Sequence, residues 1–144
     1  MKMHNRLATA FAAVAAFVAM APVQAQDVRV IARVPFEFKV GNTSLPRDTY
    51  RISHLNGRPE MLLVRSDRKG VFVRAQEVRM ARNDQNPVLT FHRYGDEYFL
   101  REIRLQGSAR LDLPETNAER DAAEHRTDRL ATRMQTVIVV AEVR

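Results

Sequence analysis

The sequence contains no cysteine, and this absence excludes three kinds of chemistry. A thiol nucleophile is impossible, no lipid can be attached to a cysteine after processing, and no disulfide can stabilise the fold. Glycine is also scarce, because the chain has only 5 glycines and they are well separated. The glycine-rich loops that bind phosphate groups are therefore absent. The fold has to be held together by a hydrophobic core.

Charged residues are missing from Leu7 to Met20, directly after a start that carries two basic residues and no acidic one. A basic start followed by about fourteen uncharged residues is typical of a signal peptide, whereas a membrane-spanning helix needs about twenty apolar residues. Val23-Gln24-Ala25 has small or medium-sized side chains at the two positions that a signal peptidase recognises, which predicts cleavage after Ala25. We therefore predict a signal peptide over residues 1–25, and one exported domain, periplasmic or extracellular, over residues 26–144.

The formal net charge of +6 falls to +4 without residues 1–25, because two basic residues and no acidic residue are removed. A basic balance can indicate nucleic acid, anionic lipid or acidic polysaccharide as the partner. The arginines recur singly at strand spacing, however, with Asp and Glu between them, which is typical of a solvated face of mixed charge. We expect an envelope component or a small molecule as the partner, no nucleic acid and no transmembrane anchor after cleavage. The arginines at strand spacing are Arg29, Arg33, Arg65, Arg74, Arg79, Arg101 and Arg104.

Alternating apolar and polar residues indicate short strands along the predicted mature chain. Asn56-Gly57 is its strongest hairpin signal, because both residues tolerate the positive φ of a type I′ turn. About seven to nine short strands at this spacing predict an all-β sandwich or small barrel. The segments predicted as strands are residues 28–34, 36–40, 50–55, 61–64, 71–75, 88–94, 98–105 and 109–113.

Two places interrupt the strand pattern. Beyond Ala75 the apolar positions shift to Val78 and Met80, which predicts a bulge or a strand end. Residues 83–87, Asn-Asp-Gln-Asn-Pro, have the composition of a loop. Both features indicate that the middle of the chain consists of several short strands.

The C-terminal part contains the only segment with helical character. Thr116 and Glu119 follow the capping-box pattern, in which the hydroxyl and the carboxylate each accept a hydrogen bond from an exposed backbone N–H. This pattern predicts a helix over residues 117–131 on the surface or fringe of the β body. Residues 137–143 are too apolar and β-branched for a free tail, so we predict a final strand that returns to the sheet.

Three stretches of the chain resemble a family of small exported proteins from acidobacterial genomes. They are Val-Pro-Phe-Glu-Phe-Lys-Val-Gly at 34–41 with the following Leu45-Pro46 and Tyr50, Phe-His-Arg-Tyr-Gly-Asp-Glu-Tyr-Phe-Leu at 91–100, and Leu113-Pro114 before the helix start. Members commonly have Leu-Pro-Ala-Gly before the tyrosine, whereas this chain has Arg47-Asp48, so its turn has to be made by Asp. The family has no assigned activity. The resemblance therefore implies the fold and export, and no site residues.

No pattern of catalytic or metal-binding residues is present. The serines lie in no nucleophile-elbow sequence, and none of the mature histidines, His54, His92 and His125, has a second histidine at metal-ligand spacing. Asp96-Glu97 lie in a predicted turn, where acidic residues usually bond the local backbone. We therefore predict a protein that is not an enzyme and that has no cofactor and no metal.

The hairpin of residues 91–100 is the one candidate binding surface. With Tyr94-Gly95-Asp96-Glu97 as its turn, Arg93 faces Tyr98 and His92 faces Phe99 across the strands. Tyrosine and arginine are enriched at binding surfaces, so the candidate site residues are Arg93, Tyr94, Tyr98 and His92. The alternative is that these pairs only fix the register of the hairpin.

These observations predict an exported, non-enzymatic envelope protein that acts by binding or by a structural role. The alternative is a small-molecule carrier in which a β-barrel encloses a ligand cavity. A closed barrel with an apolar void on the order of a few hundred Å³ would favour the carrier, and a filled sandwich would favour surface binding. An enzyme would need a cleft that brings His92 or His54 together with acids.

Overall fold

The computed structural model describes residues 30–55, 58–84, 86–105, 107–127 and 134–143. The predicted signal peptide, Asn56-Gly57 and the last part of the predicted helix lie outside these residues. In chain order the elements are β1 (Val30–Val34), β2 (Phe38–Val40), β3 (Thr43–Leu45), β4 (Asp48–Leu55), β5 (Arg58–Arg65), β6 (Gly70–Arg74), β7 (Gln76–Asp84), β8 (Val88–Tyr94), β9 (Glu97–Arg104), β10 (Gly107–Asp112), α1 (Asn117–Thr127) and β11 (Gln135–Val143). The predicted all-β fold with one helix and a final strand is confirmed.

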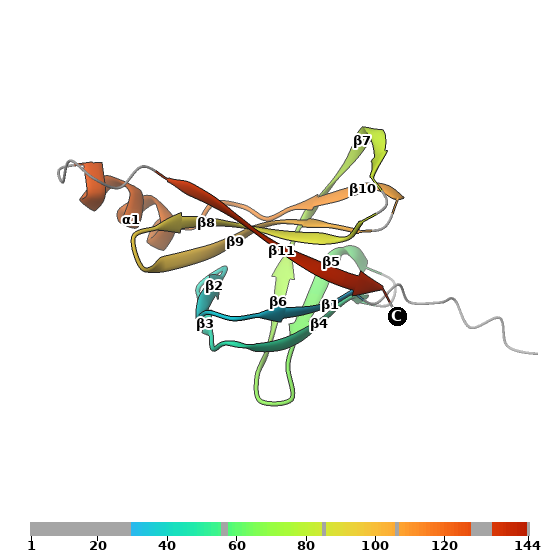
Figure 1. Ribbon diagram of the computed structural model, residues 1–144, viewed down its shortest axis with the longest axis horizontal. Coiled ribbons are helices and arrows are strands. Elements are labelled where there is room, and N and C mark those ends of the chain that lie inside the picture. Colours follow the sequence, from blue (N-terminus) through green and yellow to red (C-terminus); the bar gives the residue numbers. More distant parts are fainter. Residues whose placement is uncertain (1–29, 56–57, 85, 106, 128–133, 144) are drawn as a thin grey trace, which may run out of the picture.

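The strands form one nearly closed, barrel-like sheet (Figure 1). β11 lies between β1 and β8. On the side of β1 the order continues with β4, β5 and β6, and on the side of β8 it continues with β9, β10 and β7. The strands β2 and β3 form a short hairpin beside β9.

The chain joins the two ends of this sheet at Ala75, the single residue between β6 and β7. β6 pairs with β5, whereas β7 pairs with β10, so the polypeptide changes its partner strand within one residue. The Ala75 N–H donates to the carbonyl of Glu60, 2.9 Å away, at this point. The strand end that the shifted apolar pattern predicted after Ala75 is confirmed.

The strands are more numerous than the sequence pattern indicated, because the described residues form eleven of them. Thr43–Leu45 pairs with β2 directly after the turn at Gly41, and the predicted loop over residues 83–87 begins later than expected. Asp84 still pairs with Gly107, so β7 extends through Asn83 and Asp84. Strand pairing uses backbone groups, which polar side chains such as those of Asn and Asp do not remove.

The core lies inside the barrel and follows the alternation of the strands. On β1, Val30, Ala32 and Val34 are buried, and Arg33 is exposed. The rings of Phe38, Tyr50 and Phe91 are among the largest buried side chains of the core, and each is no more than 1% exposed. Phe38 packs edge-on against both other rings, with centroids 5.1 and 5.3 Å away. Burial and the neighbouring Asp48 raise the pKa of Tyr50.

The turns follow the predicted chemistry where they can be described. Gly41 and Gly95 have φ angles of 56° and 62°, which favour glycine, and each begins a two-residue turn. At the start of β4, the Asp48 carboxylate accepts the N–H of Thr49 at 2.8 Å. The described residues include no other residue with positive φ, so the chain enters β4 at Arg47-Asp48 without the conformation that favours glycine.

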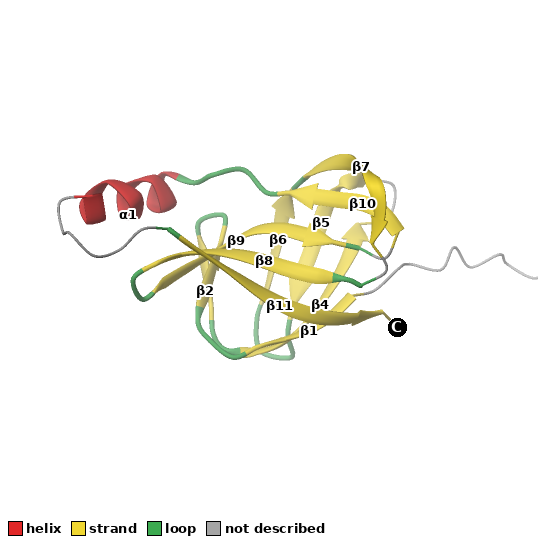
Figure 2. Cartoon of the chain, turned by 45° about the horizontal axis from the view of Figure 1, so that its top comes forward, coloured by secondary structure: helices red, strands yellow, loops and turns green. Residues whose placement is uncertain are grey.

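The helix α1 lies at one end of the barrel, after the loop of residues 113–116 that follows β10 (Figure 2). The Glu119 N–H donates to the Thr116 hydroxyl at 3.2 Å, which confirms that half of the predicted capping box. The Glu119 carboxylate contacts the sheet instead of the capping backbone. No helix in the described part of the chain has the length and apolar character that crossing a membrane requires.

Candidate functional site

The predicted hairpin is formed by β8 and β9, which are joined by a two-residue turn at Gly95-Asp96. The predicted cross-strand pairs are confirmed, because Arg93 faces Tyr98 and His92 faces Phe99. Neighbouring residues on a strand point to opposite faces of the sheet. The four candidate residues are therefore divided into two groups.

The first group, Arg93 and Tyr98, packs on the edge of the core. The Arg93 guanidinium lies over the Tyr98 ring, 5.3 Å from its centroid, and its Nε donates to the carbonyl of Gly95. The Tyr98 ring also stacks against the Phe36 ring, with a centroid distance of 3.9 Å. Phe36 in turn meets the buried Phe91 edge-on. These contacts fit the alternative in which the pair fixes the hairpin register.

The second group, His92 and Tyr94, lies beside α1. Glu119 on this helix is only 2% exposed, and its two carboxylate oxygens are shared between two partners. His92 Nδ1 lies 3.0 Å from Oε1, and the Arg101 guanidinium donates to Oε2 at 3.0 Å. Burial, followed by the negative charge of Glu119, raises the pKa of Tyr94. One buried carboxylate thus attaches the helix to β8 and β9.

Sequence reasoning missed Glu119 and Arg101 as members of this cluster. The capping-box pattern explained Glu119 locally, although its carboxylate reaches a histidine 27 positions away. Arg101 is the extra residue of a bulge, because Thr90 pairs with Glu102 while Phe91 pairs with Leu100. The bulge allows Arg101 to reach Glu119. A histidine beside a carboxylate can act as a general base, but here the carboxylate is also held by a guanidinium.

Truncating Tyr98 to alanine tests whether the hairpin is a structural feature. Because its ring stacks on Phe36 and covers the core, we expect Tyr98→Ala to lower the free energy of unfolding by about 3 kcal/mol, as large aromatic losses do. Tyr98→Phe, which keeps the ring, is the control and should stay within about 0.5 kcal/mol. Urea unfolding followed by circular dichroism measures both. A loss below about 0.5 kcal/mol for Tyr98→Ala would instead favour a recognition surface.

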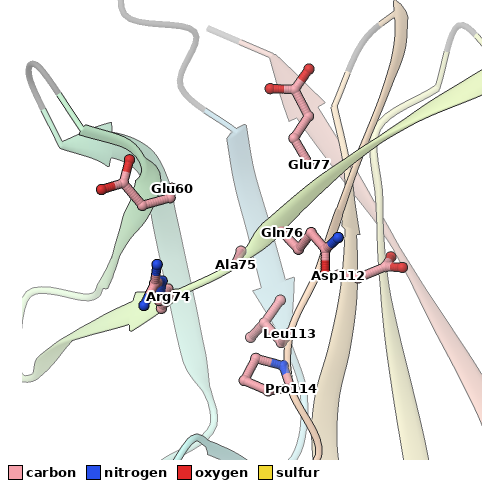
Figure 3. A pocket seen from close by; sticks show the side chains of 8 residues that line it. All are labelled: Glu60, Arg74, Ala75, Gln76, Glu77, Asp112, Leu113 and Pro114. Atoms are coloured by element: carbon pink, nitrogen blue, oxygen red, sulfur yellow. The ribbon is translucent and has the colours of Figure 1, made fainter.

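A second site lies where β6 passes into β7 (Figure 3). It is a pocket of about 520 Å³, which we call the crossing pocket. Ala75 and Leu113, both buried, form its apolar part together with Pro114. The residues that line the crossing pocket are Glu60, Arg74, Ala75, Gln76, Glu77, Asp112, Leu113 and Pro114.

The change of partner strand at Ala75 produces this hollow. Arg74 is still opposite Met61 on β5, whereas Gln76 is already opposite Asp112 on β10. The two parts of the sheet diverge between these pairs. In Figure 3, Glu60 and Arg74 therefore lie on one side of Ala75, and Leu113 and Pro114 lie on the other.

The charges at the crossing pocket are only partly neutralised. Asp112 is paired with the Arg110 guanidinium, whose Nε lies 2.8 Å from a carboxylate oxygen. Glu60, Arg74 and Glu77 are exposed, and among the described residues no ion pair of their side chains is formed. The pocket thus offers two carboxylates and one guanidinium next to an apolar surface. This combination suits a ligand that has both an apolar part and a charged amino group.

Sequence reasoning located the interruption at Ala75 but not the pocket. Its lining comes from three segments that are distant in the sequence, around Glu60, around Ala75 and around Leu113. The pairing of β5 with β6 brings Glu60 to Ala75, and the pairing of β7 with β10 brings Leu113 there. No known protein family, curated protein or solved structure matches this chain. The resemblance to the acidobacterial family stays a prediction, and the function has to be inferred from the sites themselves.

Proposed function

We propose that this protein is an exported, non-enzymatic envelope protein that binds a small amphipathic ligand in the crossing pocket. The observation that carries the proposal is the pocket itself. Its volume of about 520 Å³ falls within the range typical of ligand sites, roughly 300 to 1,000 Å³. It combines a buried apolar surface at Ala75 and Leu113 with the charges of Glu60, Arg74 and Glu77, which form no ion pair within the described part of the chain.

The charged groups of the lining support ligand binding. The eight described lining residues include no histidine and no serine, cysteine or lysine nucleophile. Carboxylates and a guanidinium at a pocket rim orient a ligand through charge-assisted hydrogen bonds. The charged and apolar groups of this lining can therefore recognise a small amphipathic ligand.

The alternative function, a carrier with its ligand inside the barrel, receives less support from the packing. The buried ring of Phe38 packs edge-on against the rings of Tyr50 and Phe91 in the core. A ligand at that position would have to displace side chains that are at most 1% exposed. The crossing pocket lies where β6 passes into β7, and a ligand can bind there without such a rearrangement.

Native mass spectrometry of the protein recovered from the envelope fraction of its producing cells tests the proposal. We expect a chain that begins at Gln26 and that carries the additional mass of a small ligand. Gln76→Trp, which places an indole in the crossing pocket, should remove the additional mass. Val140→Trp, which adds the same ring on the exposed face of β11, is the control and should retain it.

Three outcomes contradict parts of the proposal separately. An intact chain that begins at Met1 argues against export. Wild-type protein without additional mass argues against a bound ligand. An additional mass that persists in Gln76→Trp places the ligand outside the crossing pocket.

A further inference from the structure

The outward face of β1, β4 and β5 gathers basic side chains. Ile31 on β1 is opposite Arg51 on β4, and Arg51 is opposite Arg65 on β5. Two arginines that face each other directly across a strand pair repel, and such a pair destabilises a sheet. The chain therefore keeps a charge arrangement that its fold does not favour.

More basic side chains surround this pair. Arg33 and Arg47 line a hollow of about 450 Å³ together with Pro35 and Thr49. Arg68 and Lys69 lie in the turn between β5 and β6, and the ammonium of Lys69 donates to the carbonyl of Ser44 at 2.7 Å. We call the whole group the arginine face: Arg33, Arg47, Arg51, Arg65, Arg68 and Lys69.

Acidic side chains neutralise only part of the arginine face. Asp67 is paired with Arg51 at 2.8 Å, and Asp48 lies 3.9 Å from Arg68. The hydrogen bond and charge of Arg51, with a smaller effect of Arg65, lower the pKa of Asp67. Two more acidic residues lie at the borders of the face. Glu37 accepts a hydrogen bond from the Ser44 hydroxyl, and Glu142 on β11 is opposite Ile31. The arginine face thus has six basic groups, with two acidic groups among them and two more at its borders.

The charges on other strands are more evenly balanced. On β9 and β10, Arg104 lies 3.3 Å from Glu102, and Arg110 lies 2.8 Å from Asp112. Basic and acidic side chains are thus adjacent there, whereas basic side chains outnumber acidic ones on β1, β4 and β5. Spacing along one strand could not distinguish the two cases, because the register between strands decides which charges meet.

An apolar side chain borders the arginine face. In the next row of the sheet, Ser53 is opposite Leu63, and Leu63 is opposite Phe72. Phe72 on β6 is 58% exposed, which is unusual for a large aromatic side chain in a sheet with a formed core. Exposed aromatic and aliphatic groups beside basic residues are typical of surfaces that rest on a lipid bilayer.

We infer that the arginine face, with Phe72 at its border, is a docking surface for an anionic phospholipid bilayer. The basic groups are spread over three adjacent strands and two connections, between β3 and β4 and between β5 and β6, so they match the many phosphates of a membrane surface better than a single small anion. Phe72 and Leu63 add apolar area that can enter the interface between headgroups and acyl chains. The crossing pocket is a different site, and this inference goes beyond its proposed function.

Sedimentation with lipid vesicles tests the docking surface. Vesicles of phosphatidylglycerol and phosphatidylcholine in equal parts should bind the wild type at least about tenfold more tightly than pure phosphatidylcholine vesicles. The preference should disappear in high salt, because salt screens exposed charges. The variant with both Arg51→Gln and Arg65→Gln should lose at least about tenfold in affinity, and Phe72→Ser should lose severalfold.

The matched control removes the same number of charges elsewhere. Arg79→Gln with Arg120→Gln changes two exposed arginines, on β7 and α1, and should bind nearly like the wild type. An equal loss in this control would show that only net charge acts, and would overturn the inference. The Arg51 and Arg65 variant should remain folded in thermal melts, because it removes a repulsion.

Two further outcomes would also overturn the inference. Binding to soluble alginate, an acidic polysaccharide, without binding to the vesicles would assign the arginine face to a polysaccharide. Equal binding of wild type and variant to the anionic vesicles would place the contact elsewhere. The ligand mass at the crossing pocket should be unchanged in the Arg51 and Arg65 variant, so the two proposals fail independently.

Discussion

Deletion of residues 135–144 is expected to abolish the cooperative unfolding transition of the whole domain. β11 is not an edge strand, because it pairs with β8 from Gln135 to Val140 and with β1 around Ala141. Val137, Val139 and Ala141 on its inner face also contact the core. Its loss would remove the pairings with both β1 and β8. The free energy lost is comparable with the total stability of a typical domain, about 5 to 15 kcal/mol.

Thermal melts followed by circular dichroism measure the effect. Ile138→Thr with Val140→Thr is the matched control, because both side chains are exposed on the outer face of β11. Substitutions of this kind usually change stability by no more than about 0.5 kcal/mol each. A truncated protein that melts cooperatively near the wild-type temperature would show that β11 is a dispensable tail.

Glu119→Ala is expected to cost about 3 kcal/mol of unfolding free energy. Breaking a buried ion pair by removing one partner typically costs about 3 to 5 kcal/mol, because the remaining charge stays buried without compensation. Here the side chains of Arg101 and His92 remain 24% and 27% exposed, so we expect a value at the low end. Urea unfolding measures it, and amide hydrogen exchange should show that α1 loses protection first.

Glu124→Ala provides the control on the same helix, because Glu124 is exposed. It should change stability by less than about 0.5 kcal/mol. Glu119→Gln keeps the size of the side chain and one acceptor oxygen, and should fall between the two alanine variants. If Glu119→Ala were as mild as Glu124→Ala, the attachment of α1 would not depend on the buried carboxylate.

Local patterns in the sequence predicted the elements well. Alternation located most strands within two or three residues, and the capping box located the start of α1 at Asn117. The register of β8 and β9 was also predictable, because a two-residue turn with Gly95 at positive φ leaves little freedom in the pairing. These features depend on residues that are close together in the chain.

Long-range pairings were not predictable in the same way. The pairing of β7 with β10 decides that Leu113 approaches Ala75, and nothing in the spacing of these residues specifies it. Glu119 shows a related difficulty, because the same residue type serves a local cap or a distant ion pair. The crossing pocket results from such a long-range pairing, whereas Arg51 and Arg65 meet in the β4–β5 hairpin, where a register shift between His54 and Leu55 decides which residues face each other.

The position of β11 between β1 and β8 also sets the order in which the protein can fold. The first and last described strands pair with each other, so the loop that their contact closes includes nearly the entire domain. Closing a long loop costs chain entropy before native contacts compensate for it, and folds dominated by distant pairings fold slowly. The β4–β5 and β8–β9 hairpins can form early from neighbouring residues, whereas the barrel closes only after Gln135–Val143 has been synthesised.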